Sequence, residues 1–129
     1  MITQDETADL TTQIVDAAYM VHKTMGPGLL ESVYHHCLIK ELAMRKIQVE
    51  SQVAIPLVYR GHVLNKQFVI DLLVEKQIIL EIKAVELWNP VYEAQLLSYL
   101  KLTNTKIGYI INFNVPLIKH GIKRMKNGY

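Results

Sequence analysis

The segment FVIDLLVEKQIILEIKAVE, residues 68–86, places two carboxylates and an ammonium among aliphatic residues that are expected to be buried. These three charged residues are Asp71, Glu81 and Lys83. Burying a charge without a partner is costly, so the pattern indicates a role that uses the charges. Carboxylates beside an amine are groups that hold a divalent cation and act on a phosphate ester.

The two apolar halves of this segment predict a β-hairpin. FVIDLLV and IILEIKAV are rich in β-branched residues, and a short polar stretch separates them. If the turn is centred on Lys76, Asp71 and Glu81 lie at equal distances from it and face each other. Lys83 lies two residues beyond Glu81 and shares its face. We therefore expect the three charged side chains to converge.

Two opposed carboxylates repel each other, and a divalent cation between them removes the repulsion. Oxygen ligands from Asp71 and Glu81, completed by water and the carbonyl of Ile82, suit Mg²⁺ or Mn²⁺ rather than zinc. An ammonium at Lys83 could activate a water or stabilise charge on a phosphoryl oxygen. The pattern thus favours phosphodiester hydrolysis. A structural alternative is equally supported at this point: Lys83 is buried in a salt bridge with one acid, and the other acid reaches solvent at a sheet edge.

Helices are predicted on both sides of the hairpin. Apolar residues at helical spacing predict helices over residues 8–25 and 29–45, with a Gly-Pro-Gly breaker between them. An Asn-Pro pair opens a third helix over residues 91–102.

The remaining segments predict a mixed sheet. From residue 49 the sequence alternates and is rich in β-branched residues, which predicts three or four antiparallel strands. IGYIINF, residues 107–113, is a further buried strand, and the basic end of the chain is either a short strand or a helix. A strand, a helix and another apolar strand predict a crossover into a parallel neighbour. We expect an α/β fold, also classed as α+β, with helices flanking the sheet in one domain over residues 1–129.

Composition fits a folded intracellular protein. The chain has 129 residues, of which 50% are hydrophobic and 20% charged. Cys37 is the single cysteine, so no internal disulfide forms, which is compatible with a reducing compartment. No apolar run is long enough to span a membrane, and the start of the chain is polar and acidic, unlike a signal peptide. We expect a cytoplasmic protein with no membrane partner.

Charge is distributed unevenly along the chain. Acidic residues gather near the start, and none follows Glu93. The segment after it carries Lys101, Lys106, Lys119, Lys123, Arg124 and Lys126. Such asymmetry predicts a face that meets phosphate, although a solvated basic tail explains the charges equally well.

Three segments carry a family resemblance. Asp71 followed by Glu81-Ile82-Lys83 resembles the signature of the PD-(D/E)XK nuclease superfamily, whose restriction-endonuclease-like core has the order αβββαβ. GPGLLESVY, residues 26–34, resembles the motif of the bacterial GxxExxY protein family. EAQLLSYLKLTNTKIGYIINF, residues 93–113, resembles the downstream block of that family.

The resemblance implies roles for individual residues. Asp71 and Glu81 match the paired metal ligands and Lys83 the catalytic lysine, with Mg²⁺ or Mn²⁺ as cofactor. Glu31 matches an acidic helix residue that reaches the metal site directly or through water. Tyr34 is a core residue with its hydroxyl near Glu31.

Gln95 and Tyr99 match the QxxxY element of recombination-type exonucleases in this superfamily. Their spacing puts both on one helix face, where an amide and a phenol can position the lysine or a DNA phosphate. The chain departs from the pattern at Val69, where relatives often carry arginine, and at Tyr92, where they often carry histidine. These departures weaken the expectation of activity more than that of the fold.

Other residues have competing interpretations. Residues 35–37, His-His-Cys, do not form a zinc site, because consecutive helical residues point in different directions. His22 is expected to cap or pack near a helix end, and Glu31 alone is explained by the helix dipole. Trp88 either stacks on a base or covers a helix start.

Three functions remain compatible with the sequence. The first is a metal-dependent nuclease that acts on DNA, or alternatively on RNA, with a groove bordered by the basic end and Lys101. The second is a nucleic-acid-binding module that has lost turnover. The third is a homodimeric or regulatory protein that binds no nucleic acid.

Overall fold

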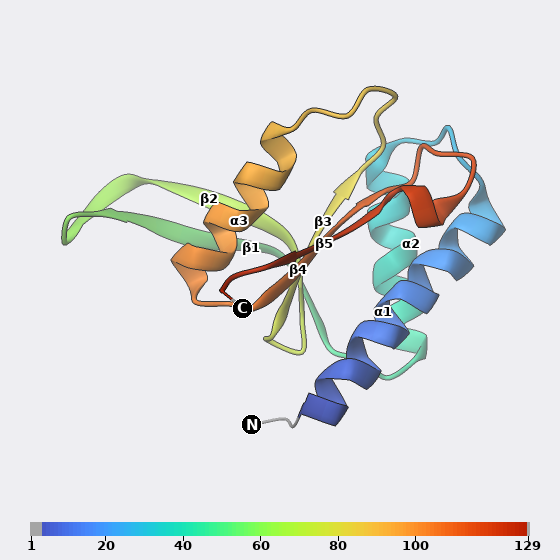
Figure 1. Cartoon of the computed structure of the whole chain (residues 1–129), viewed down its shortest axis with the longest axis horizontal. Helices are drawn as coiled ribbons and strands as arrows, with labels where there is room; N and C mark the ends of the chain where they lie inside the picture. The colour runs from blue at the N-terminus through green and yellow to red at the C-terminus, as the bar shows by residue number, and fades with distance from the viewer. Residues whose placement is uncertain (1–3, 129) are drawn as a thin grey trace.

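Five strands form one mixed sheet in the computed structural model, which describes residues 4–128 (Figure 1). Residues 1–3, which belong to the polar start of the chain, lie outside the described residues. The elements are α1 (Gln4–Met25), α2 (Glu31–Met44), β1 (Val49–Tyr59), β2 (His62–Val74), β3 (Ile78–Lys83), α3 (Val91–Thr103), β4 (Ile107–Asn112), the 3₁₀ helix η1 (Ile118–His120) and β5 (Ile122–Lys126).

The strand order in the sheet is β1-β2-β3-β4-β5. β3 and β4 are parallel and α3 connects them, as the crossover prediction requires, whereas the other neighbours are antiparallel. The basic end contains both a 3₁₀ turn and a strand, where the sequence predicted one or the other. The predicted α/β class with a mixed sheet and flanking helices is confirmed.

Helices cover the two faces of the sheet in separate layers (Figure 1). α1 and α2 pack on one face, where a large core includes Ile14, Leu38 and Ile82. α3 packs on the other face over a smaller core that includes Ile79 and Leu96. No helix in residues 4–128 is both long and apolar enough to cross a bilayer.

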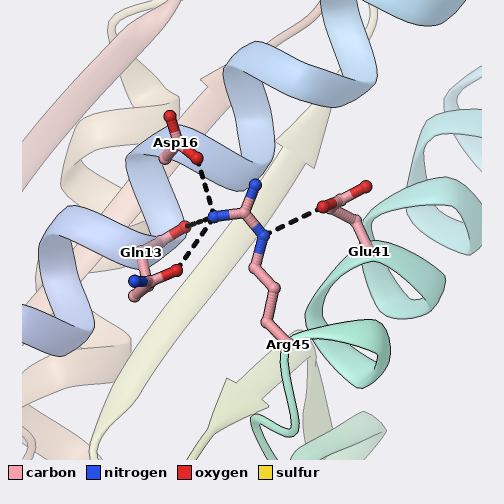
Figure 2. A network of polar contacts seen from close by, with 4 residues as sticks. All are labelled: Gln13, Asp16, Glu41 and Arg45. Atoms are coloured by element: carbon pink, nitrogen blue, oxygen red, sulfur yellow. Dashed lines mark hydrogen bonds and ion pairs between the residues drawn. The ribbon is translucent and has the colours of Figure 1, made fainter.

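Arg45 joins the end of α2 to α1 (Figure 2). Its Nε donates to Glu41 Oε2 at 2.9 Å on the same helix. Its Nη1 reaches Asp16 Oδ2 at 2.8 Å and Gln13 Oε1 at 2.9 Å on α1. This guanidinium has several partners on two helices, and it therefore fixes how α2 lies against α1.

The β1–β2 hairpin changes the face that it presents partway along its length. Ile70 packs into the core under α3, whereas Leu72 packs into the core under α1 and α2, although alternate residues of a regular strand share a face. Val49 and Val53 on β1 differ in the same way. Gln52 lies between them with a φ of +55°, so the backbone is kinked there. Asp71 is at the corresponding place on β2.

Candidate active site

The candidate site lies where β2 and β3 separate. Their pairing runs from Val74↔Ile78 to Leu72↔Leu80, which is the register predicted from the turn position. Beyond that pair, side chains replace the main-chain ladder. The Asp71 N–H donates to Glu81 Oε2 at 2.8 Å, and the Ile82 N–H donates to Asp71 Oδ2 at 2.7 Å. The two acids therefore converge as expected, each bonded to the backbone of the opposite strand.

Each carboxylate keeps one oxygen without a hydrogen bond or ion pair to any residue among 4–128. Glu81 is only 5% exposed. Burial and the charge of Asp71 raise the pKa of Glu81 to about 8, against the opposing effects of the Asp71 N–H and Lys83. These two facing carboxylates, Asp71 and Glu81, which we call the fork, thus hold more negative charge than their surroundings stabilise, and a bound cation relieves that condition.

Lys83 ends β3 and is half-buried. Its Nζ lies 4.6 Å from the ring centroid of Tyr92, at the start of α3. Within the described part of the chain Lys83 makes no ion pair with Asp71 or Glu81, so the salt bridge of the structural alternative is not formed. Its charge still lowers the pKa of Glu81 and of Glu31. The ammonium therefore lies near both acids and is not neutralised by them.

Glu31 is the first residue of α2, and the preceding turn fixes its position. Gly26 and Gly28 adopt φ values of +72° and +95°, which favour glycine. The fully buried Tyr34 donates its hydroxyl to the Gly26 carbonyl at 2.6 Å and accepts from the Leu29 N–H at 3.0 Å. Tyr34 is a core residue, as expected, and its hydroxyl bonds to the turn before Glu31.

Glu31 remains exposed to solvent on one side. Partial burial and the charge of Asp71 raise its pKa, and Lys83 lowers it. Glu31 is therefore within electrostatic range of the fork, although within residues 4–128 it forms no hydrogen bond with Asp71 or Glu81. This placement suits a role through water.

Tyr99 is partly buried where α3 packs on the smaller core, whereas Gln95, one turn earlier on the helix, is exposed. Tyr99 stacks on Phe68 with ring centroids 4.1 Å apart. Burial and the charges of Glu81 and Asp71 raise the pKa of Tyr99, and a side-chain hydrogen bond with Gln95 opposes the rise. The helix thus brings the phenol of Tyr99 within electrostatic range of the two acids, and the Gln95 amide interacts with that phenol.

His35 is a site neighbour whose position the sequence did not reveal. It lies one turn after Glu31 on α2 and is 8% exposed. Its Nε2 is 2.9 Å from Ser51 Oγ. Burial lowers the pKa of His35 and the nearby charge of Asp71 opposes this effect. The i, i+4 spacing from Glu31 could have placed His35 on the same helix face as Glu31. The His-His-Cys run instead suggests only a zinc motif, which helix geometry excludes.

A second position found only in the structure is Asn112, which is buried at the end of β4. Its Oδ1 accepts from the Val85 N–H and its Nδ2 donates to the Val85 carbonyl, both at 3.0 Å. These bonds hold the loop after β3. Trp88 in this loop is 38% exposed, packs edge-on against Tyr92 and donates to Glu93 Oε1 at 3.1 Å. It covers the start of α3, and stacking on a base stays a prediction.

The basic residues divide between the two faces of edge strand β5. Lys123 lies on the α3 face, where its Nζ is 3.5 Å from Glu93 Oε1, and it is opposite Ile110, which pairs with Glu81. Arg124 and Lys126 alternate with it and lie on the α1 and α2 face.

Lys126 pairs with Ile107 at the far end of β4 from the fork. Lys101 in the last turn of α3 and Lys119 in η1 are both exposed, and in the described residues neither forms an ion pair with the acids. The sheet register therefore places Lys123 level with Glu81, and the nucleic-acid roles of all these basic residues stay predictions.

The donor set fits a small hard cation. Within residues 4–128 no three side chains of the His, Cys, Asp or Glu type gather closely enough to hold a metal by themselves. Asp71 and Glu81 provide two carboxylates, and Mg²⁺ is commonly bound by one or two carboxylates with water and substrate phosphate. Two surface hollows beside α1 are lined by none of the site residues, so they are separate from the fork.

The sequence profile of the PD-(D/E)XK nuclease superfamily matches residues 8–125. A search of the curated proteins finds no match.

Proposed function

The chain belongs to the PD-(D/E)XK nuclease superfamily, and from this premise we propose that it hydrolyses phosphodiester bonds of DNA with Mg²⁺ or Mn²⁺ as cofactor. One observation carries the proposal. Asp71 and Glu81 converge at the fork with one uncommitted oxygen each, and burial together with the charge of Asp71 raises the pKa of Glu81, both of which a bound cation would offset.

Asp71 and Glu81 are the proposed ligands, together with the carbonyl of Ile82, and Glu31 acts through water. When bound, the cation supplies charge neutralisation at the phosphate and acidifies a water molecule. The protein contributes the spacing of the two carboxylates, since the bonds from the Asp71 and Ile82 N–H groups hold them in place.

Lys83 is the proposed catalytic lysine. Its ammonium lies near the acids without an ion pair to them, so it remains available to a phosphoryl oxygen or an attacking water. Gln95 and Tyr99 position the substrate phosphate or the lysine from α3. Lys123 extends the positive charge towards the backbone of the substrate.

A second candidate function is nucleic-acid binding without turnover. Tyr92 favours it, because its ring lies over the Lys83 ammonium at the position where relatives often carry histidine. Val69, which replaces a frequent arginine, is 41% exposed on β2 and offers no charge to a phosphate. Both departures reduce contacts to substrate and leave the metal ligands unchanged.

The narrower parts of the proposal rest on sequence motifs. Gly28, Glu31 and Tyr34 support membership of the GxxExxY group. Lys101, Lys119, Arg124, Lys126 and Trp88 are proposed as further nucleic-acid contacts, and the protein is proposed to act in the cytoplasm, alone or as a homodimer.

A cleavage screen tests the proposal. Single-stranded, double-stranded and branched DNA, together with RNA, are incubated with the protein in Mg²⁺, Mn²⁺ or EDTA. Cleavage is expected only with a divalent ion, and Glu81→Ala and Lys83→Ala should abolish it. Lys40→Ala, which removes an exposed ammonium from α2, is the control and should cleave normally. Binding without metal-dependent cleavage of any substrate would favour the second candidate.

A further inference from the structure

The β1–β2 hairpin extends past the body of the protein as an arm, which we define as residues 56–67 (Figure 1). Every residue from 58 to 67 is exposed. Phe68, which directly follows the arm on β2, stacks on Tyr99 of α3. Neither core includes a residue of the arm. The arm is therefore free to contact a partner along its length.

A tight turn gives the arm a defined shape. Arg60 and Gly61 have φ values of +49° and +83°, as a two-residue type I′ turn requires. Tyr59 pairs with His62, and Val58 pairs with Val63. The register shifts between Pro56 and Val58, which marks a bulge that increases the twist of the ribbon. The arm is thus an ordered two-stranded ribbon.

The charge of the arm has a single sign. No acidic residue occurs from residue 51 to residue 70, whereas Arg60 and Lys66 are cationic and His62 adds an imidazole. Exposed apolar side chains accompany them: Val58, Tyr59 and Val63 are 51%, 63% and 74% exposed. A basic ribbon with apolar side chains matches a polyanion that also presents apolar groups.

We propose that the arm binds duplex DNA by lying in a groove beside the cleavage site, an inference that rests on the proposed nuclease function. The major groove of B-DNA is about 12 Å wide and admits a two-stranded β-ribbon. Strands in a ribbon are about 4.8 Å apart, which leaves room for side chains on both edges. Arg60 and Lys66 then contact phosphates, while Tyr59 and its cross-strand partner His62, which share one face of the ribbon, face base edges.

The arm and the site belong to one strand, which sets the length of DNA that they share. Nine residues of β2, residues 62–70, lie between Gly61 and Asp71, and the ten residue steps span at most about 33 Å. One turn of B-DNA measures about 34–36 Å. When a DNA phosphate lies at the fork, the tip of the arm can therefore contact the duplex about one helical turn away from that phosphate.

A second copy of the chain is a poorer occupant. Paired arms would bring Arg60 and Lys66 of each copy close together, and like charges on neighbouring strands repel. Pro56 lies on β1, which is an edge strand, and it has no N–H to donate to a strand added there. Both features oppose pairing between arms.

Binding assays with altered arms test the inference. Affinity is measured by fluorescence anisotropy in EDTA at several salt concentrations, on a duplex of about 30 base pairs and on its single strand. On the duplex, log affinity falls linearly as log salt rises. Arg60→Gln with Lys66→Gln should make this negative slope less steep by about 2, because two phosphate contacts are lost. The matched control, Lys23→Gln with Lys40→Gln, removes two exposed lysines from α1 and α2 and should keep the wild-type slope.

A shortened arm, in which Asn-Gly joins Pro56 to Gln67, tests the whole element without touching either core. It should weaken duplex affinity about tenfold or more and leave single-strand affinity unchanged. On a duplex of about 10 base pairs the two proteins should differ much less.

Equal binding of the long duplex by wild-type and shortened-arm proteins would overturn the inference, as would wild-type protein that binds no duplex. Sedimentation that shows a wild-type dimer and a shortened-arm monomer of unchanged duplex affinity would assign the arm to self-association instead. Metal-dependent cleavage of a short duplex is measured in parallel. If shortening the arm does not change duplex affinity but the protein still cleaves the duplex with metal, only the inference about the arm fails. The nuclease proposal then stands.

Discussion

Glu81→Gln removes the buried charge at the fork and should make the metal-free protein more stable at alkaline pH. Glu81 has a pKa of about 8 in the folded protein, against 4.5 for an ordinary glutamate. The folded state therefore holds this proton more tightly than the unfolded state does. Its contribution to stability is complete below about pH 4.5 and is lost as the pH rises through 8.

The size of the effect follows from the two pKa values. At 1.36 kcal/mol for each pKa unit, the rise from 4.5 to about 8 corresponds to about 5 kcal/mol at a pH above 8. Domains of this size have free energies of unfolding of roughly 5–15 kcal/mol, so the loss is large. The glutamine variant cannot ionise, so it should match the wild type near pH 4.5 and exceed it by up to about 5 kcal/mol at pH 9.

Urea unfolding of the metal-free proteins at pH 4.5, 7 and 9, followed by circular dichroism, measures the difference. Glu86→Gln, which removes an exposed carboxylate from the next loop, is the control and should change little at any pH. Saturating Mg²⁺ should stabilise the wild type at pH 9, by about 2.7 kcal/mol at one hundred times its dissociation constant, and should not stabilise Glu81→Gln. Parallel pH profiles for the wild type and Glu81→Gln would refute the argument that Glu81 carries unrelieved charge.

Three further predictions, made on four variants, test other parts of the structure. Tyr92→His should raise the cleavage rate about 2–5-fold, because a contact of about 0.5–1 kcal/mol over Lys83 is removed; an unchanged or lower rate in a steady-state assay would show that the ring does not restrain the lysine. Arg45→Met should lower the free energy of unfolding, measured in urea, by about 1–3 kcal/mol, because it leaves its partners on both helices unpaired. Asp16→Asn should lower it by less than about 1 kcal/mol, because the Asp16 side chain is 66% exposed. Equal losses for the two variants would contradict the bridging role of Arg45. Tyr34→Phe should cost about 1 kcal/mol and lower cleavage by loosening the turn before Glu31, and a variant that loses stability but keeps full activity would separate that turn from the site.

The fold was predictable because its signals are local. Apolar spacing located the first two helices and the Asn-Pro pair located the third, each to within a few residues. The succession of an apolar run, a helix and another apolar run identified the parallel pair β3 and β4. The register at the fork followed from the turn around Lys76, since two strands joined by a short turn have little freedom to slip.

Other features depend on contacts between distant residues and could not be predicted. The carboxylates of Asp71 and Glu81 bond to main-chain N–H groups, and no pattern of side-chain types reports which backbone groups a sheet leaves unpaired. The contact of Lys83 with Tyr92 depends on how α3 packs. His35 reaches Ser51 only because α2 lies across β1.

The kink in the β1–β2 hairpin accounts for both the site and the arm. At Gln52 and Asp71 the hairpin turns its other face to the body, and the ladder between β2 and β3 ends at the same level. The Asp71 and Ile82 N–H groups then need other acceptors, and the two carboxylates supply them at the cost of facing each other. In each carboxylate one oxygen therefore accepts a main-chain hydrogen bond, and the other oxygen has no group that balances its charge among the described residues. Beyond this change of face the hairpin packs Ile70 and Phe68 against the smaller core and then continues past it as the arm, so the groups proposed to bind the cation and those proposed to bind DNA lie on one irregular hairpin.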